Sequence, residues 1–420
     1  MSDPFFRIHT LGCKVNQYES QEIRERLLEA GMREAAPGRK ADLYIVNTCT
    51  VTRKADKDSL YAIRRSHRED PGASIVATGC MAEFGAGILR KEPGVRMVIK
   101  NRDKAKISAR IIKDFLPSGK GISFFEGRTR AFLKVQDGCN NFCSYCIVPH
   151  VRGSSRSKPV LQILEESRRL IANGYREIVL TGICLGAYGR DLKRGMSLAG
   201  VIERMQELPG LKRIRISSIE AKDVDDGLIR CLRWPGKLCR HMHIPIQSGD
   251  DDILAAMDRR YTRRDYLDLI ARLKKACPDI AITTDVLVGF PGEEERNFLN
   301  TLDLVRRIEP LRTHIFPYSP RPNTKAYALR KAVALDIVRD RLKRMSEAAD
   351  DCARNYQQKR LSSVMDVLME TPSKDHPGEW EGYTDTYMKV VFRSRKRLSN
   401  NIISLRLKKL IGNKIMAVLP

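Results

Sequence analysis

The 420-residue sequence predicts an α/β protein with three parts: a parallel sheet, a partial (βα)6 barrel and a small all-β module. Three observations predict this order. Strand-like and helix-like runs alternate through residues 1–100, six more strand-like runs alternate with helices up to residue 317, and short β-like runs fill the segment after residue 358. We therefore expect three domains, at residues 1–118, 125–356 and 358–420.

The N-terminal part consists of repeated strand–helix units. We expect strands at 5–11, 42–47 and 74–78, and a cysteine follows the end of each. The helices expected at 17–30 and 53–70 combine spaced apolar residues with many charges. Because repeated βα units form parallel sheets, the carboxyl ends of these strands should share one edge. The Pro-, Ser- and Gly-containing segment 117–121 has the composition of a linker.

The central part alternates between the two periodicities six times. Strands are expected near 131–136, 176–182, 211–217, 240–246, 280–288 and 311–317, and helices at 158–173, 197–208, 263–277, 293–308 and 332–357. Six βα units of this size predict an incomplete barrel with its chemistry at the carboxyl ends of the strands. The last part should hold strands at 363–370, 384–392, 401–407 and 414–419.

Charge and cysteine content narrow the class of protein. Lysine and arginine total 76 against 51 aspartates and glutamates, a net charge of +25, which indicates a polyanionic partner such as nucleic acid. No apolar run approaches the roughly 18 residues of a membrane span, and the N-terminus does not resemble a signal peptide. We therefore expect a cytoplasmic protein, in which the 11 cysteines serve metal binding or catalysis rather than disulfides.

One cysteine motif directly follows the first expected barrel strand. Cys139, Cys143 and Cys146 form a C-x3-C-x2-C pattern, which can ligate three irons of a [4Fe–4S] cluster and leave the fourth iron open. Zinc is the alternative, with His150 as a fourth ligand. The position at a barrel mouth favours a catalytic cluster.

A second cysteine set is dispersed in the sequence but equivalent in topology. Cys13, Cys49 and Cys80 each follow one of the three N-terminal strands, so three loops could present three thiolates to a second cluster. The remaining cysteines are expected to be packing or turn residues, and Cys184, although near the barrel mouth, is not expected to be a ligand. The packing and turn residues are Cys231, Cys239, Cys277 and Cys352.

The motifs together resemble the radical S-adenosylmethionine (SAM) methylthiotransferases. The resemblance covers essentially the whole chain. It is carried by the barrel cysteine motif and by the segments Thr10–Gln17, Asn47–Thr52, Thr78–Cys80, Ser217–Glu220, Pro245–Gly249, Arg259–Thr262, Asp285–Glu293 and Phe316–Ser319. The first two segments are most similar to the branch that acts on N6-threonylcarbamoyladenosine (t6A) at position 37 of tRNA. The branches that act on isopentenyladenosine or on an aspartate of a ribosomal protein are alternatives.

The resemblance implies a set of cofactors and contacts. Cys139, Cys143 and Cys146 would hold the cluster that cleaves SAM, and the cluster on Cys13, Cys49 and Cys80 would carry the sulfur. A sulfur donor and an electron donor, which the sequence does not name, would also be needed. Residues expected to contact SAM are Tyr145, Ser218, Glu220, Gln247 and Arg259. The terminal β module resembles a TRAM domain, a small RNA-binding barrel.

The C-terminal charge pattern supports RNA binding independently of the resemblance. From Lys389 to Lys414 there are nine basic residues and no acidic one, interleaved with aromatic residues such as Phe392. Basic strands that also carry aromatics suit an RNA backbone and stacked bases. We therefore expect the anticodon stem-loop of tRNA as partner. A zinc-containing RNA-binding protein without catalysis is the remote alternative.

Overall fold

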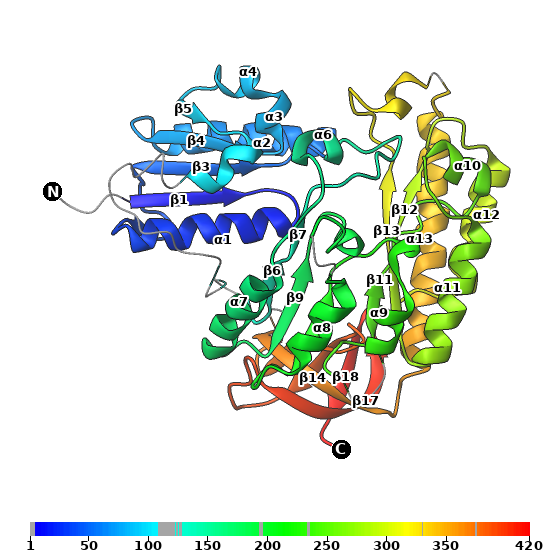
Figure 1. The fold of residues 1–420 in the computed structure, drawn as a ribbon. Coiled ribbons are helices and arrows are strands. Elements are labelled where there is room, and N and C mark those ends of the chain that lie inside the picture. Colours follow the sequence, from blue (N-terminus) through cyan, green and yellow to red (C-terminus); the bar gives the residue numbers. More distant parts are fainter. Residues whose placement is uncertain are drawn as a thin grey trace.

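A computed structural model describes residues 5–107, 122, 125, 128–192, 196–232, 236–329, 331–373 and 376–420. The linker predicted at 117–121 lies outside the described residues. Three layers of structure follow one another along the chain, and they occupy the upper left, the centre and right, and the bottom of Figure 1. No helix within the described ranges is long and apolar enough to span a bilayer.

The N-terminal layer is a five-stranded parallel sheet in the order β2-β1-β3-β4-β5. Three of its strands lie where the sequence predicts them, whereas the short edge strands β2 and β5 were not predicted because two or four residues carry little periodic signal. The strands are β1 (Phe5–Thr10), β2 (Arg33–Glu34), β3 (Leu43–Thr48), β4 (Ser74–Gly79) and β5 (Val95–Val98).

Successive residues of β3 pack on opposite faces of this sheet. Ile45 packs with Leu27 of α1, whereas the next residue, Val46, packs with Ile63 of α2. This alternation is the period of two that a strand imposes on its side chains. The two faces are therefore covered by one helix each. The helices of this layer are α1 (Lys14–Glu29), α2 (Arg53–Glu69), α3 (Met81–Phe84) and α4 (Ala86–Leu89).

The central layer is an open, all-parallel half-barrel. Two three-stranded sheets, β10-β9-β6 and β11-β12-β13, are joined by a parallel bridge between Ile214 and Leu238. The strands are β6 (Ala131–Lys134), β9 (Glu177–Thr181), β10 (Arg213–Ile216), β11 (His241–His243), β12 (Ala281–Val288) and β13 (Arg312–Pro317). All six lie where the sequence predicts strands. A short antiparallel pair, β7 (Gln136–Asp137) and β8 (Arg156–Ser157), brackets the segment with the barrel cysteines.

The helices of the central layer are α6 (Val148–Arg152), α7 (Val160–Ala172), α8 (Leu198–Gln206), α9 (Asp226–Cys231), α10 (Asp251–Ala256), α11 (Arg263–Ala276), α12 (Glu295–Ile308) and α13 (Leu335–Gln358). All but α6 cover the outside of the half-barrel, whereas α6 lies beside the N-terminal layer and packs against α3 (Figure 1). Between them and the strands lies the main apolar core. The three short helices α6, α9 and α10 were not predicted.

The C-terminal layer is a closed five-stranded barrel in the order β14-β15-β16-β18-β17. Its strands are β14 (Val364–Pro372), β15 (Glu379–Thr384), β16 (Lys389–Arg393), β17 (Ile402–Ile411) and β18 (Lys414–Val418). The single strand predicted at 384–392 is wrong. Residues 385–388 form the turn between β15 and β16, where Tyr387 takes a left-handed conformation with φ 72°.

Buried arginines dock this barrel onto the lower end of the half-barrel. Arg213 donates to the Asp366 carbonyl over 2.6 Å, and Arg215 donates to the Asp385 carbonyl over 2.9 Å. Arg215 is held in turn by Glu177 at 2.7 Å. Hydrogen bonds to charged donors are stronger than neutral ones, so these contacts fix the barrel against β9 and β10.

Candidate functional site

The three N-terminal cysteines line a single cavity of about 690 Å³. Cys13 caps the start of α1, Cys49 follows β3, and Cys80 caps the start of α3. Parallel pairing places these three strand ends at one edge of the sheet. The half-barrel strands β9 to β13 line the opposite wall, so the cavity lies between the two layers.

Small and amide side chains bring the three cysteine loops together. Gly12 has φ +90°, and a Cβ there would lie 2.8 Å from Cys49 Sγ, so only glycine allows this approach. Asn16 Nδ2 donates to the carbonyls of Leu11 (2.7 Å) and Thr48 (3.1 Å), which ties the first loop to the second. Asn16 belongs to the motif that the sequence singled out, although its joining role was not predicted.

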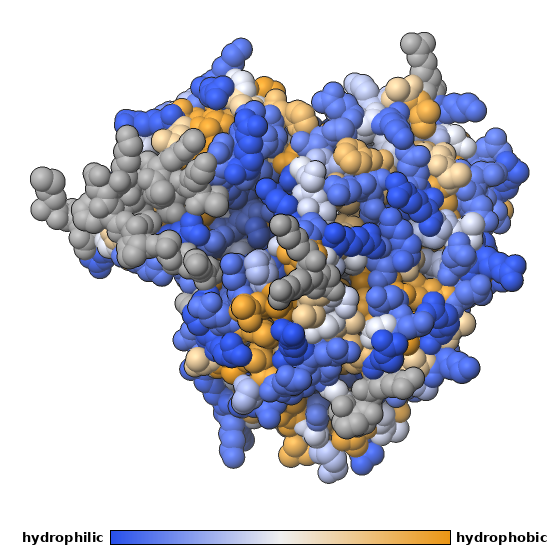
Figure 2. All heavy atoms as spheres, in the orientation of Figure 1, coloured by the Kyte–Doolittle hydropathy of each residue, from blue (hydrophilic) through white to orange (hydrophobic). Residues whose placement is uncertain are grey.

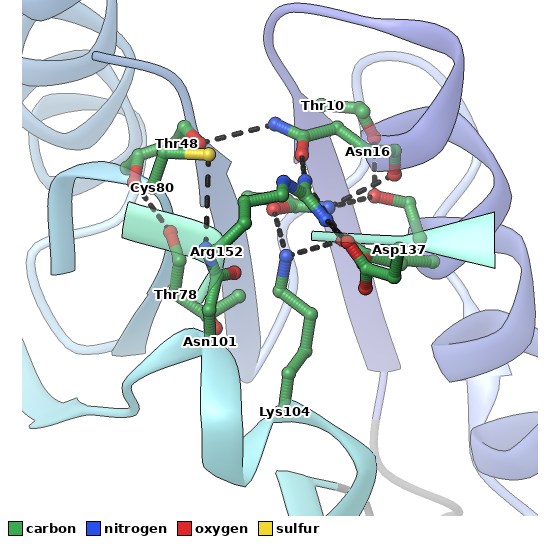
Figure 3. A network of polar contacts seen from close by, with 12 residues as sticks. Thr10, Asn16, Thr48, Thr78, Cys80, Asn101, Lys104, Asp137 and Arg152 are labelled. Atoms are coloured by element: carbon green, nitrogen blue, oxygen red, sulfur yellow. Dashed lines mark hydrogen bonds and ion pairs between the residues drawn. The ribbon is translucent and has the colours of Figure 1, made fainter. Parts of the chain in front are cut away.

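A buried ion network joins these loops to Arg152, in the helix that follows the barrel cysteines (Figure 3). Arg152, in the helix that begins just after Cys146, donates to Asn16 Oδ1 at 2.5 Å and to Glu19 Oε1 at 2.9 Å. Lys104 approaches the same carboxylate at 2.5 Å. Burial opposes ionisation of Glu19, but the surrounding cations hold the pKa of its carboxyl well below the usual range.

The barrel cysteines lie in a loop provided with N–H donors. The backbone N–H of Asn141 donates to Cys139 Sγ over 3.4 Å, and Arg259 Nη1 donates to Cys143 Sγ over 3.6 Å. A hydrogen bond from Cys184 lowers the pKa of the Cys139 thiol to about 7, whereas burial raises that of Cys146 to about 12. Cys139 is therefore the most readily ionised of the three, and the ionised thiolate is the form that binds a metal.

The residues expected to contact SAM surround this loop. Glu220 forms an ion pair with Arg259, whose Nε is buried without a partner among the described residues. Tyr145 packs beside an apolar group that includes Leu287, and burial raises the pKa of its hydroxyl well above the usual range.

The two remaining SAM candidates lie at strand ends. Ser218 lines the cavity just beyond β10. Gln247 has φ 61°, an unusual conformation for a residue other than glycine and one that often marks functional sites. Ser218 thus shares a cavity with the N-terminal cysteines, whereas the Glu220–Arg259 pair lies beside Cys143.

The sulfur spacing fits clusters better than zinc. Four ligands at about 2.3 Å from one zinc would place the sulfurs about 4 Å apart. Among the described residues, neither cysteine trio has all its sulfurs within 4.8 Å of one another, and thiolates on different irons of a cluster are spaced more widely. His150, the alternative zinc ligand, is exposed and contacts the Phe142 ring at 5.7 Å. Three cysteines and nearby N–H donors therefore suit a [4Fe–4S] cluster with one open iron.

A polar group on the half-barrel wall was not predicted. His243 Nε2 lies 3.2 Å from Asp285 Oδ1, and these two residues and His314 each offer a ligand atom within 4.8 Å of the others. Each lies on the face of its strand that lines the cavity. On β13, for example, the cavity residues Arg312, His314 and Phe316 occupy every second position. The available signal was polar residues recurring with period two in strands otherwise predicted to be buried.

Comparison with known proteins agrees with this arrangement. Residues 133–305 match the radical SAM superfamily, and residues 6–100 match a family described as uncharacterized protein family UPF0004. The solved structure of the radical SAM methyltransferase TsrM from Kitasatospora setae shares the fold, with a TM-score of 0.57 at 13% identity over 78% of this chain and 77% of that one. The fold and the cysteine loop therefore define a radical SAM protein.

Full-length relatives narrow this class to a family. The threonylcarbamoyladenosine tRNA methylthiotransferase MtaB of Bacillus subtilis is 38% identical over 96% of this chain and 93% of its own length. MtaB of Thermotoga maritima is 38% identical over 92% and 91%. The tRNA-2-methylthio-N(6)-dimethylallyladenosine synthase of Clostridium tetani is 34% identical over 97% and 94%. The chain belongs to the radical SAM methylthiotransferases, enzymes that use SAM and two [4Fe–4S] clusters.

Proposed function

We propose that this protein adds a methylthio group to C2 of t6A at position 37 of tRNA, in the cytoplasm. The observation that carries the proposal is the shared cavity, which is lined by Cys13, Cys49 and Cys80 on one side and by residues of the half-barrel strands on the other. A base bound there would contact both layers at once. The higher identity to MtaB proteins than to the dimethylallyladenosine synthase favours t6A as substrate.

Different residues of the chain would bind the two clusters and SAM. When bound, SAM and the two clusters supply the radical that takes hydrogen from C2 and the sulfur and methyl group that replace it. Cys139, Cys143 and Cys146 would hold one cluster, and Cys13, Cys49 and Cys80 the other. Tyr145, Ser218, Glu220, Gln247 and Arg259 would orient SAM.

The Glu220–Arg259 pair offers both charges that an amino acid group requires. The Arg259 guanidinium suits its carboxylate, and the Glu220 carboxylate suits its ammonium. SAM ends in such a group, so the two residues would separate from one another to bind it. The buried, unpartnered Arg259 Nε is a further donor at this position.

The C-terminal module, residues 358–420, would act as a TRAM domain that grips the anticodon stem-loop. Its turn after β16 exposes a cluster of cations, Arg393, Arg395, Lys396 and Arg397. Hydrophilic and hydrophobic residues are mixed at the bottom of Figure 2, where this module lies. The exposed cations suit phosphate contacts, which position an RNA without reading its sequence. We place the other two domains at 1–118 and 125–356.

Mass spectrometry of tRNA nucleosides tests the proposal. A strain from which the gene is deleted should lose 2-methylthio-t6A and accumulate t6A, and the wild-type gene should restore the product. A gene carrying Cys139→Ala should not. Loss of 2-methylthio-isopentenyladenosine instead would assign the protein to the other tRNA branch, and unchanged tRNA with an unmodified ribosomal protein aspartate would assign it to the third branch.

A further inference from the structure

The cavity between the two layers carries more positive than negative charge. Its lining includes Lys14, Arg152, Arg215 and Arg312, whereas Asp285 is the only carboxylate among the described residues that line it. His243 contacts that carboxylate at 3.2 Å. A cavity with surplus cations attracts an anionic group, because like charges gathered in a concave site add up to a positive potential.

Two of the four cations already have carboxylate partners. Arg152 Nη1 lies 2.9 Å from Glu19, and Arg215 Nε lies 2.7 Å from Glu177. Both arginines are also almost fully buried, and their partners lie behind the cavity wall. They serve the structure and are not free to bind a ligand.

Lys14 and Arg312 have no carboxylate partner within the part of the chain that the structure describes. Lys14 Nζ lies 5.6 Å from the centre of the Phe132 ring, and the Arg312 guanidinium lies 5.9 Å from that of Tyr387. Lys14 is half-buried and Arg312 is exposed, and no described carboxylate neutralises either charge.

The two cations come from different layers but face one region. Lys14 stands in the first turn of α1, directly after Cys13, and Arg312 begins β13 on the half-barrel wall. Both line the same cavity as His314, whose pKa is lowered by burial and, against the effect of Asp285, by His243, Arg312 and Lys14. A ligand group between them would be gripped from the N-terminal sheet and from the half-barrel together.

We propose that Lys14 and Arg312 form a carboxylate subsite that binds the threonyl carboxylate of t6A and so selects this nucleoside over isopentenyladenosine. The inference rests on the proposed function and adds the residues that decide the substrate. The threonylcarbamoyl group carries one carboxylate, whereas the isopentenyl group is uncharged and has no group that two cations could bind. A substrate that leaves the two cations without an anionic partner binds less well, which discriminates against it.

The experiment varies the substrate first. The enzyme with both clusters is given three anticodon stem-loops that carry t6A, its threoninamide analogue (a neutral carboxamide of the same shape) or isopentenyladenosine. Single-turnover methylthiolation and binding to each stem-loop are measured. Loss of the charge should reduce kcat/KM by about 10-fold or more, the effect of one charge-assisted hydrogen bond.

The same measurements on variants identify the residues. Lys14→Gln and Arg312→Gln should each act on t6A about 10-fold more slowly and lose the preference over the carboxamide. Lys14→Arg and Arg312→Lys, which keep the charge, should retain most of the preference for t6A over the carboxamide. Lys343→Gln and Arg264→Gln make the same changes at exposed positions away from the cavity and should behave as wild type.

The outcomes separate the two claims. Wild-type enzyme that turns over t6A and its carboxamide equally well overturns the carboxylate subsite and leaves the proposed function standing. Lys14→Gln and Arg312→Gln variants that keep the wild-type preference for t6A over the carboxamide likewise overturn the subsite and leave the proposed function standing. Wild-type enzyme that modifies isopentenyladenosine and not t6A overturns the proposed function, and the inference falls with it.

Discussion

Arg152 Nη1 and Glu19 Oε1 lie 2.9 Å apart, and this ion pair joins helix α6, which follows the barrel cysteines, to helix α1, which follows Cys13. Both side chains are almost completely buried. Lys104 and Lys134 complete the set around the carboxylate at 2.5 and 3.1 Å. Asp137 also contacts Arg152 and Lys134, at 3.1 and 3.5 Å, so two carboxylates hold three cations that come from three different segments.

Glu19→Gln should therefore destabilise the folded protein strongly. It leaves Lys104 facing a neutral amide, and it leaves Arg152 and Lys134 with Asp137 alone. Removal of one member of a buried charge group typically costs about 3–5 kcal/mol. Urea unfolding of the variant gives the free energy. Glu22→Gln, which changes a residue one turn further along α1 that pairs with Arg26 nearer the surface, is the control and should cost at most about 1 kcal/mol. Equal costs for the two would show that the network adds no stability.

The stability of the central layer should depend on pH through Glu177. Burial disfavours its ionised form, but neighbouring arginines outweigh this and lower the pKa to about 2. The unfolded value is about 4.3, so the carboxylate stabilises the fold above pH ~4.3 by about 3 kcal/mol, and this contribution disappears as the pH falls towards 2. Unfolding of wild type and Glu177→Gln is compared from pH 7 to pH 3. The gap between them should be largest at pH 7 and narrow on acidification. A constant gap would contradict the ionised pair with Arg215.

The barrel cysteines should account for half of the iron. The enzyme should hold about eight irons, and replacing Cys139, Cys143 and Cys146 with alanine should leave about four. That variant should produce no 5′-deoxyadenosine from SAM. Cys231→Ala and Cys352→Ala, which remove buried cysteines on the outer helices, should retain all the iron. Full iron in the triple variant would contradict the assignment.

Much of the site was predictable because its residues lie in short motifs at strand ends. The parallel order of β1, β3 and β4 follows from their βα units, and that order brings Cys13 and Cys49 to one edge. The ion network around Glu19 was not predictable. Its members come from positions 19, 104, 134 and 152, and only the docking of two layers makes them neighbours. The Tyr387 turn was missed because its flanking residues favour a strand, and the turn is imposed by barrel closure.

RNA binding should depend on the exposed cations after β16. Changing Arg393, Arg395, Lys396 and Arg397 to glutamine should weaken tRNA binding and flatten its dependence on salt, because each lost phosphate contact reduces the slope of log K against log[salt] by about 0.7–0.9. Fluorescence titrations at several salt concentrations measure the slope. Truncation before residue 358 is a poorer test, since it would expose the buried Arg213 and Arg215 that dock the barrel. An unchanged slope would assign the contacts to another surface, such as the exposed Arg53, Lys54 and Lys57 of α2.

The division of labour between the two cysteine sets provides the last prediction. Changing Cys13, Cys49 and Cys80 to alanine should leave about four irons, and the variant should still release 5′-deoxyadenosine from SAM under reducing conditions. It should form no 2-methylthio-t6A, because the sulfur has no iron to bind. Both products are measured in one anaerobic reaction with t6A-bearing tRNA.

The segments that carry the two cysteine sets are nevertheless in contact, so a change in one set can affect the other. Cys80 packs against Ile147 and Val151, the residues that follow Cys146. The small cavity left by alanine there should shift the barrel loop little, because α6 remains tied to α1 through Arg152. Continued methylthiolation by the triple variant would make the N-terminal cysteines structural. Loss of 5′-deoxyadenosine with the barrel iron intact would instead show that Cys80 positions the SAM site through this contact, and Cys80→Ser alone should then reproduce the loss.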